Sequence, residues 1–326
     1  MFSIPAPTGQ AALIPAAAHE DQQYFRSLQG AAREYLAEEG YVVVRGLLDP
    51  GTCAGICQSF ASEVKRYPGF LYRQASARAE RNELNEHGHV MNPLLNLQDL
   101  DRNRFAGLRQ RSLDAFTSGG IVTALRGLFG EDPKLVQSMY FEGNAATWAH
   151  QDTYYLDSER VGTMVAAWIA LEDIHPGAGR FFVYPRSHRV DILKNGGDFD
   201  IAFHHDRYKS LIIDVIRRHG LELRAPALQC GDVLFWNSKT IHGSLRTQGT
   251  TRTRQSLTAH YIPRSHRFLQ LQSRIKPLTL SAHNGIQVHC PKDQGRLQNR
   301  MTLLVESRLP GPFYFAKRLA VKVATR

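Results

Sequence analysis

The chain has 326 residues, of which 43% are hydrophobic and 21% charged, close to the averages of soluble globular proteins. Its formal net charge is +10, but the basic residues are spread along the chain and form no motif of interleaved basic and aromatic residues. We therefore expect a solvated basic surface and no nucleic-acid partner. No stretch reaches the roughly 20 apolar residues that a membrane-spanning helix needs, so no transmembrane segment is expected.

The amino-terminal 20 residues are rich in Ala and Pro and lack the basic start of a secretory signal. They are expected to form a flexible lead-in. The four cysteines, Cys53, Cys57, Cys230 and Cys290, are too few and too scattered for a disulfide framework. This pattern indicates reduced thiols and a cytoplasmic protein.

Helical patterning comes first along the chain. Spaced apolar residues predict a helix over 21–39, which Gly40 would end, and a β-branched and aromatic strand over 41–45. Asp49 and Pro50 then mark the cap and first turn of a second helix, to about residue 65. The polar, irregular stretch 67–104 predicts either a surface loop or a lid.

After a further helical pattern over 108–129, the periodicity changes toward strands. Many short strands separated by turn residues favour a β-sandwich or barrel core with flanking helices, and no repeat or long linker divides the chain 1–326 into more than one domain. Ile201 to His219 predicts an inserted helix. The segment 313–326 predicts a helix packed on the domain, with a membrane-surface helix as the alternative. The expected strands are 135–142, 147–153, 163–171, 180–184, 222–225, 232–236 and 255–262.

The most informative segment is Trp148-Ala149-His150-Gln151-Asp152. On a strand, His150 and Asp152 would point to the same face and offer two metal ligands side by side. A third ligand, His242, follows the apolar strand that ends at Trp236. Two histidines and one carboxylate leave positions open for a keto acid and dioxygen, the pattern of non-haem iron(II) oxygenases, whereas a structural zinc site would be closed and rich in cysteine.

A basic strand follows His242, in the run Thr251-Arg252-Thr253-Arg254-Gln255-Ser256. A dicarboxylate held at iron by its keto end needs a buried partner for its far carboxylate, and a guanidinium can pair with it through two parallel bonds. We predict that Arg254 is this partner and that Ser256, on the same face, donates its hydroxyl to the same carboxylate.

Four motifs in order resemble the phytanoyl-CoA dioxygenase family. They are His150-Gln-Asp152, the strand from Ala166 to Asp173, the run from Gly179 to His188, and His242-Gly-Ser244. The resemblance covers roughly 41–262, which we take as the core, and leaves 263–326 as a carboxy-terminal extension. It implies a double-stranded β-helix, a jelly-roll or cupin-like barrel, with helices outside.

The resemblance also implies the chemistry. It implies an oxygenase that uses iron(II), 2-oxoglutarate and dioxygen, with His150, Asp152 and His242 as the catalytic metal ligands. It independently favours Arg254 over Arg252 and adds Gln137 as a second cosubstrate contact. Because relatives that halogenate lack the carboxylate ligand, Asp152 favours hydroxylation or another oxidation over halogenation of a small-molecule substrate, with a lean toward specialised metabolism.

Arg180 departs from the family, which has a small residue at this position. On a strand, Arg180 and Phe182 would share one face, and Phe181 and Val183 the other. If the Arg180 face is the interior, its guanidinium would need an anionic partner, so we expect it to contact a substrate carboxylate or phosphate.

Other histidines have a simpler interpretation. The pairs His87/His89 and His204/His205 have spacings that metals can use, but histidines in polar segments are usually solvated, and His260 is expected only to pack or hydrogen-bond inside the barrel. The alternative function is a catalytically silent barrel that binds a small molecule or a partner. The oligomeric state stays open.

Overall fold

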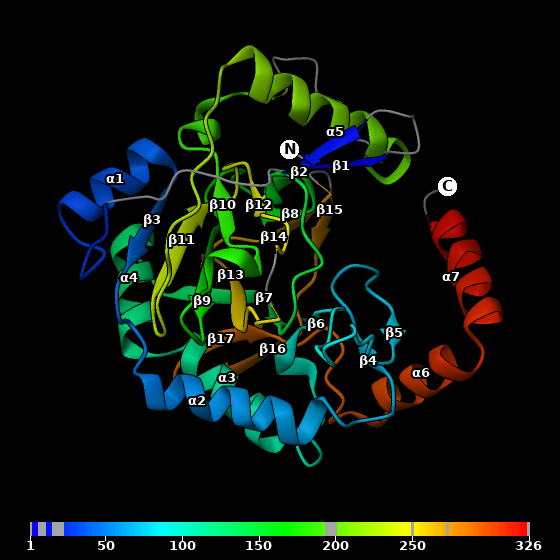
Figure 1. Ribbon diagram of the computed structural model, residues 1–326. Helices are drawn as coiled ribbons and strands as arrows, with labels where there is room; N and C mark the ends of the chain where they lie inside the picture. Colours follow the sequence, from blue (N-terminus) through cyan, green and yellow to red (C-terminus); the bar gives the residue numbers. More distant parts are fainter. Residues whose placement is uncertain are drawn as a thin grey trace.

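The computed structural model describes residues 2–5, 11–14, 23–192, 201–248, 251–271 and 274–324. One large mixed sheet dominates the fold (Figure 1), in the strand order β16-β17-β7-β13-β9-β11-β3, with β6 also paired to β7. All of its pairings are antiparallel except that of β17 with β7. Its strands are β3 (Tyr41–Val44), β6 (Leu94–Leu95), β7 (Pro133–Phe141), β9 (Val165–Ala170), β11 (Val233–Asn237), β13 (Ser256–Pro263), β16 (Leu280–His283) and β17 (Ile286–His289).

Smaller sheets complete the β structure. The pair that matters for the site is β10-β12, in which Val183 is opposite His242. The others are β15-β14-β8, β4-β5 and β1-β2. Their bounds are β1 (Phe2–Pro5), β2 (Ala11–Ile14), β4 (Leu71–Tyr72), β5 (Ala79–Glu80), β8 (Leu156–Ser158), β10 (Phe181–Val183), β12 (His242–Ser244), β14 (Phe268–Gln270) and β15 (Arg274–Lys276).

Helices surround these sheets (Figure 1). Helices α1 to α4 cover one side, α5 lies over the opposite end, and α6 and α7 form an arm that ends the described chain. The helices are α1 (Ala31–Glu39), α2 (Pro50–Ser59) with a π-helical continuation (Phe60–Val64), α3 (Ala106–Phe116), α4 (Gly119–Phe129), α5 (Ile201–Arg218), α6 (Leu297–Arg308) and α7 (Pro310–Ala324). The expectation of a mainly β fold with flanking helices is confirmed.

Strand alternation divides the core into two layers. On β13, Leu257, Ala259 and Tyr261 pack in the large cluster shared with the helices. The alternate positions of the sheet, such as Trp168 on β9 and Trp236 on β11, pack instead against Phe181 of the smaller sheet. Successive strand residues face opposite sides, so the sequence of β13 places its polar residues Ser256, Thr258 and His260 in this second layer. The candidate site lies in the second layer.

Several predicted elements differ from the structure. The predicted strand 147–153 is wrong, because only His150 makes a bridge there and Asp152 begins a 3-10 turn (Asp152–Tyr154). The predicted strand 222–225 is also wrong and is reduced to one bridge at Arg224. The helix expected over 108–129 is interrupted, since Ser118 is extended and starts α4 anew before two glycines. Of the helix expected over 21–39, the described residues 23–39 form a helix only in α1, and Gly40 ends it in the left-handed conformation, as expected.

The two ends of the chain add structure that the patterns did not predict. The lead-in expected over 1–20 contains the paired strands β1 and β2, and its other residues lie outside the described part. The extension expected over 263–326 supplies β16 and β17 to the large sheet. All four cysteines are free. Among the described residues, no helix has both the length and the apolar character needed to cross a membrane.

Candidate metal centre and cosubstrate site

Backbone pairing brings the two histidines together although they are far apart in the chain. The amide of His150 donates to the carbonyl of His242 at 3.0 Å, and the reverse bond is 2.9 Å. Gly243 permits this approach, because a Cβ there would lie 2.5 Å from the carbonyl oxygen of Thr147. Ser244 adds a tether, since its hydroxyl accepts from the amide of Thr147 at 2.8 Å. The His-Gly-Ser run thus holds the segment that carries the first two ligands.

Each imidazole is oriented by a backbone carbonyl. Nδ1 of His150 lies 2.9 Å from the carbonyl oxygen of Trp148, and Nδ1 of His242 lies 2.9 Å from that of Thr240. A carbonyl oxygen only accepts, so both Nδ1 atoms carry a proton, and Nε2 is the atom that each ring offers to a metal ion. This is the arrangement that prepares a histidine for a metal ion.

Asp152 completes the cluster. Its Oδ1 lies 3.7 Å from Nε2 of His150 and 3.5 Å from Nε2 of His242. The ligand atoms of the three residues lie within 4.8 Å of one another. Metal bonds of about 2.1 Å place neighbouring ligand atoms about 3 Å apart, so a small inward movement of these side chains would enclose one ion. The 3-10 turn, rather than the predicted strand, aims the carboxylate at the histidines.

The protonation states favour a cation. Burial lowers the pKa of His242 to about 4, which keeps its imidazole neutral at neutral pH. Burial opposes ionisation of Asp152, but the nearby imidazoles, first that of His242, lower its pKa well below the usual value. A buried carboxylate beside imidazole nitrogens is a donor set that suits a divalent transition metal.

Arg254 is buried on the same side of the fold. It is 3% exposed, and the one described hydrogen bond of its guanidinium runs from Nη1 to the carbonyl of Gly179 at 3.1 Å. Its Nε has no partner, and no carboxylate pairs with it in the part of the chain that the structure describes. The guanidinium lies 5.9 Å from the ring centre of Trp168, which packs on Phe181 and so connects it to His242. A buried cation without a counter-ion is where an anionic ligand would bind.

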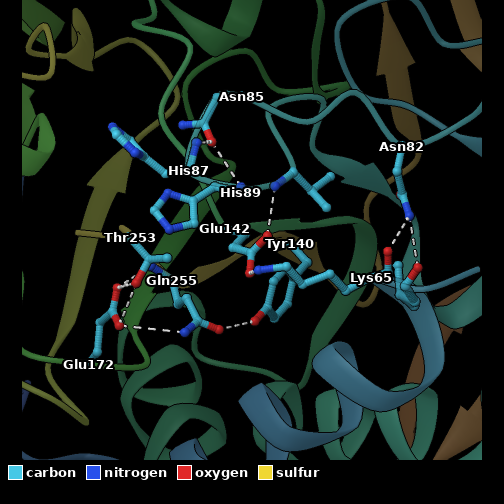
Figure 2. A network of polar contacts seen from close by, with 12 residues as sticks. Lys65, Asn82, Asn85, His87, His89, Tyr140, Glu142, Glu172, Thr253 and Gln255 are labelled. Atoms are coloured by element: carbon cyan, nitrogen blue, oxygen red, sulfur yellow. Dashed lines mark hydrogen bonds and ion pairs between the residues drawn. The ribbon is translucent and has the colours of Figure 1, made fainter. Parts of the chain in front are cut away.

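Glu172 accepts hydrogen bonds from the two residues next to Arg254 in the chain, Thr253 and Gln255 (Figure 2). Its carboxylate accepts from the Thr253 hydroxyl and from the Gln255 amide, both at 2.7 Å. The side chain of Gln255 in turn accepts from the Tyr140 hydroxyl at 2.6 Å. With residues 253 and 255 held on one side, alternation sends Arg254 to the other.

Glu142 anchors the backbone of Arg254 from the opposite direction. The Glu142 carbonyl accepts from the Arg254 amide at 2.8 Å. Its carboxylate is ion-paired with Lys65 at 2.6 Å and accepts from the amide of Val90 at 2.7 Å (Figure 2). The irregular stretch 67–104 is therefore bonded to the end of β7, next to the segment that carries Arg254.

The other predicted cosubstrate residues lie on the same inner layer. Ser256 is fully buried at the start of β13, and its hydroxyl lies 3.4 Å from the carbonyl of Arg254. Gln137 on β7 is half-buried and sits opposite His260. Their contacts with a cosubstrate stay predictions.

Arg180 is buried, 9% exposed, immediately before β10. The alternation expected there is observed, because Phe181 and Val183 join the cluster beside the metal ligands while Phe182 joins the cluster under α5. The face that looks onto His242 is thus that of Phe181, whose ring stacks on the imidazole at 5.3 Å. A substrate contact by Arg180 stays a prediction.

Two groups near the ligands were not predicted to take part in the site. Tyr155 lies 5.9 Å from His150, measured between ring centres, and its hydroxyl is 2.9 Å from Nε2 of His205 on α5. The local sequence could not place His205 there, because this contact depends on how α5 packs over the site. The second group is His260, whose Nε2 lies 3.4 Å from Oδ2 of Asp152. His87 and His89, in contrast, are near Asn85 and Glu86 and are not part of the cluster.

Solved structures with a similar fold support the fold assignment. The carbocyclase SnoK from nogalamycin biosynthesis has 18% identity and a TM-score of 0.53, covering 74% of this chain and 86% of its own. The epimerase SnoN, in complex with Fe3+, alpha ketoglutarate and nogalamycin RO, has 18% identity and a TM-score of 0.51, covering 78% and 95%. EctD from S. alaskensis, with 2-oxoglutarate and 5-hydroxyectoine, has 16% identity and a TM-score of 0.52, covering 85% and 93%.

These likenesses confirm the expected double-stranded β-helix fold. Among these similar proteins, SnoN is in complex with Fe3+ and alpha ketoglutarate, and EctD is in complex with 2-oxoglutarate. No curated protein matches the sequence. The profile of the family described as Phytanoyl-CoA dioxygenase (PhyH) matches residues 36–255. That match spans more than half of the chain and includes all four motifs, so the chain belongs to the phytanoyl-CoA dioxygenase (PhyH) family.

Proposed function

We propose that this protein is an iron(II)- and 2-oxoglutarate-dependent oxygenase that hydroxylates an unactivated C–H bond of a small molecule. One observation carries the proposal. A largely buried His-Asp-His cluster and a buried arginine that has no counter-ion among the described residues lie on the same inner layer of the fold. Neither feature stabilises the protein by itself, because buried charges without partners are costly. Together they fit a metal ion and an anionic cosubstrate.

The residues divide the work as follows. His150, Asp152 and His242 hold the iron, and Arg254 binds the far carboxylate of 2-oxoglutarate, with Ser256 and Gln137 as weaker contacts. When bound, this pair of cofactors supplies the oxidising power for the reaction. The protein orients the ligands through the carbonyls of Trp148 and Thr240 and excludes water with the rings around His242.

Hydroxylation is the reaction that we propose among those open to this fold. A halogenating enzyme needs a free coordination position for a halide ion. In this chain the carboxylate of Asp152 would fill that position. The carbocyclase and epimerase among the similar structures show that this fold also supports other reactions. Product analysis by mass spectrometry distinguishes hydroxylation from these reactions, because hydroxylation adds one oxygen atom, ring formation or desaturation removes two hydrogen atoms, and epimerisation leaves the mass unchanged.

The substrate side of the site is the one that His150 faces. Its side chain is 15% exposed, whereas that of His242 is 5% exposed. Trp148, Tyr155 and His205 surround this edge. They fit a small molecule that has an apolar surface and a polar group within reach of Tyr155 and His205. We propose that this substrate belongs to specialised metabolism, and that Arg180 contacts an anionic group on it. We also propose a cytoplasmic location, which the free cysteines support.

Anaerobic addition of iron(II) and then 2-oxoglutarate tests the function without a known substrate. We expect the weak visible charge-transfer band of the iron and keto-acid chelate in the wild-type protein. A silent barrel that binds only a small molecule or a partner would give no band, and that result would replace this proposal with the alternative.

A further inference from the structure

We propose that Trp236 and His260 are positioning residues that hold one oxygen of Asp152 and leave the other as the single metal-binding oxygen. This inference rests on the proposed function and concerns the shape of the same site. It predicts that the carboxylate binds the metal through Oδ1 alone, so that it does not occupy a second coordination position.

The two carboxylate oxygens have different neighbours. Oδ1 is the atom nearest to both ligand histidines, at 3.7 Å from His150 and 3.5 Å from His242. Oδ2 accepts a hydrogen bond from Nε1 of Trp236 at 2.8 Å. The indole nitrogen only donates, so it fixes Oδ2 as an acceptor and occupies one of its lone pairs.

His260 approaches the same Oδ2 from the neighbouring strand. Its Nε2 is 3.4 Å from Oδ2, longer than a made hydrogen bond, and neither of its ring nitrogens has a hydrogen-bond partner in the described chain. The side chain is only 2% exposed. A buried imidazole without partners is costly, and Oδ2 of Asp152 lies close enough to Nε2 to become its acceptor. A small shift of the carboxylate would close this bond.

The backbone of β13 is distorted at this point. Gln137 pairs with His260 and Leu135 with Tyr261, so the register between β13 and β7 shifts between His260 and Tyr261. Such bulges redirect a side chain and are frequent beside active sites. Trp236 is fixed independently, because its ring packs 5.0 Å from that of His242 and 5.0 Å from that of Phe181. Two rigid elements, β11 and β13, therefore converge on Oδ2.

The test uses cobalt(II) as a probe, whose visible absorption reports its coordination. Trp236→Phe keeps an aromatic ring, although a smaller one, and removes the N–H donor, and His260→Leu removes the second donor. Loss of a partner that orients a metal ligand typically costs 10- to 100-fold in metal affinity, and we expect about this loss in both variants together with a changed cobalt spectrum. His260→Gln, whose amide can still donate to Oδ2, should recover most of the affinity.

Thr258→Val is the matched control. Thr258 is buried on the same face of β13, opposite Trp168, and no described contact joins it to Asp152. Its cobalt affinity and spectrum should equal those of the wild type, and urea transitions of the metal-free proteins show whether each variant folds. If Trp236→Phe does not fold, the His260→Leu and His260→Gln pair decides the question.

Two results would overturn the proposal. Unchanged cobalt affinity and spectrum in both donor-removing variants would show that Oδ2 needs no support. Complete loss of cobalt binding in both His260→Leu and His260→Gln, equal to that of Asp152→Ala, would make His260 a ligand instead. A wild-type protein that binds neither cobalt nor 2-oxoglutarate would refute the proposed function itself, which keeps the two failures distinct.

Discussion

Replacing Arg254 by methionine should weaken cosubstrate binding and stabilise the protein at the same time. The guanidinium is 3% exposed, and burial lowers its pKa to about 10 from an ordinary value of 12.5. The folded state therefore disfavours the charged form, and at neutral pH this costs about 3 kcal/mol of stability. Loss of the hydrogen bond to Gly179 offsets about 1 kcal/mol, so the free energy of unfolding should rise by about 2 kcal/mol.

The effect on binding has the opposite sign. A carboxylate paired with a buried guanidinium makes charge-assisted hydrogen bonds worth about 1.5–3 kcal/mol each. Loss of about 3 kcal/mol corresponds to roughly a 100-fold rise in the dissociation constant of 2-oxoglutarate. Calorimetric titration of the manganese-loaded protein measures binding, and urea unfolding of the metal-free protein measures stability.

Arg252→Met is the control for both measurements. Arg252 is exposed and only two residues away, so neither quantity should change much. Unchanged 2-oxoglutarate affinity in Arg254→Met, or an equal loss in Arg252→Met, would refute the assignment of Arg254 as the cosubstrate partner. A marked loss of stability in Arg254→Met would show instead that the guanidinium has a structural role.

Three further predictions use other parts of the molecule. Glu172→Gln should raise the dissociation constant of 2-oxoglutarate severalfold, because it weakens the contacts that orient Arg254, and calorimetry that shows no change would contradict this. Lys65→Met leaves the buried Glu142 carboxylate without its cation, so urea unfolding should show a loss of about 3 kcal/mol. Arg186→Met should have a smaller effect, because the side chain of Arg186 is 58% exposed and its pair with Glu39 is partly solvated. Burial lowers the pKa of His289 to about 4 from 6.5, so the unfolded chain takes up the proton first and the free energy of unfolding falls as the pH drops from 7 to 5. His289→Asn should reduce this fall by about 2 kcal/mol, measured by urea unfolding at the two pH values. An identical pH dependence in the variant and the wild type would be inconsistent with a buried neutral imidazole.

The metal ligands could be predicted from the sequence because their residue types and short spacings are visible in local segments of the chain. His150 and Asp152 are two residues apart, and His242 follows a strongly apolar strand. The reason given for their convergence was partly wrong, since a 3-10 turn places Asp152 and a backbone bridge places His150. The side chains meet because the His242 backbone pairs with that of His150, a contact across ninety-two positions.

The supporting residues were harder to predict because their roles depend on three-dimensional packing. In the sequence, Glu172 is one residue of the strand motif from Ala166 to Asp173, and nothing there indicates that it orients both neighbours of Arg254. His205 reaches Tyr155 only because α5 folds over the site. His260 stands out in the structure through a register shift, and no pattern of residue types reveals such a shift.

An experimental structure obtained without oxygen, with manganese(II) and 2-oxoglutarate present, tests the central claim most directly. We predict one metal ion bound by Nε2 of His150, Nε2 of His242 and Oδ1 of Asp152, with the far carboxylate of 2-oxoglutarate paired to Arg254. An ion bound elsewhere, or a cosubstrate that leaves Arg254 unpaired, would contradict it.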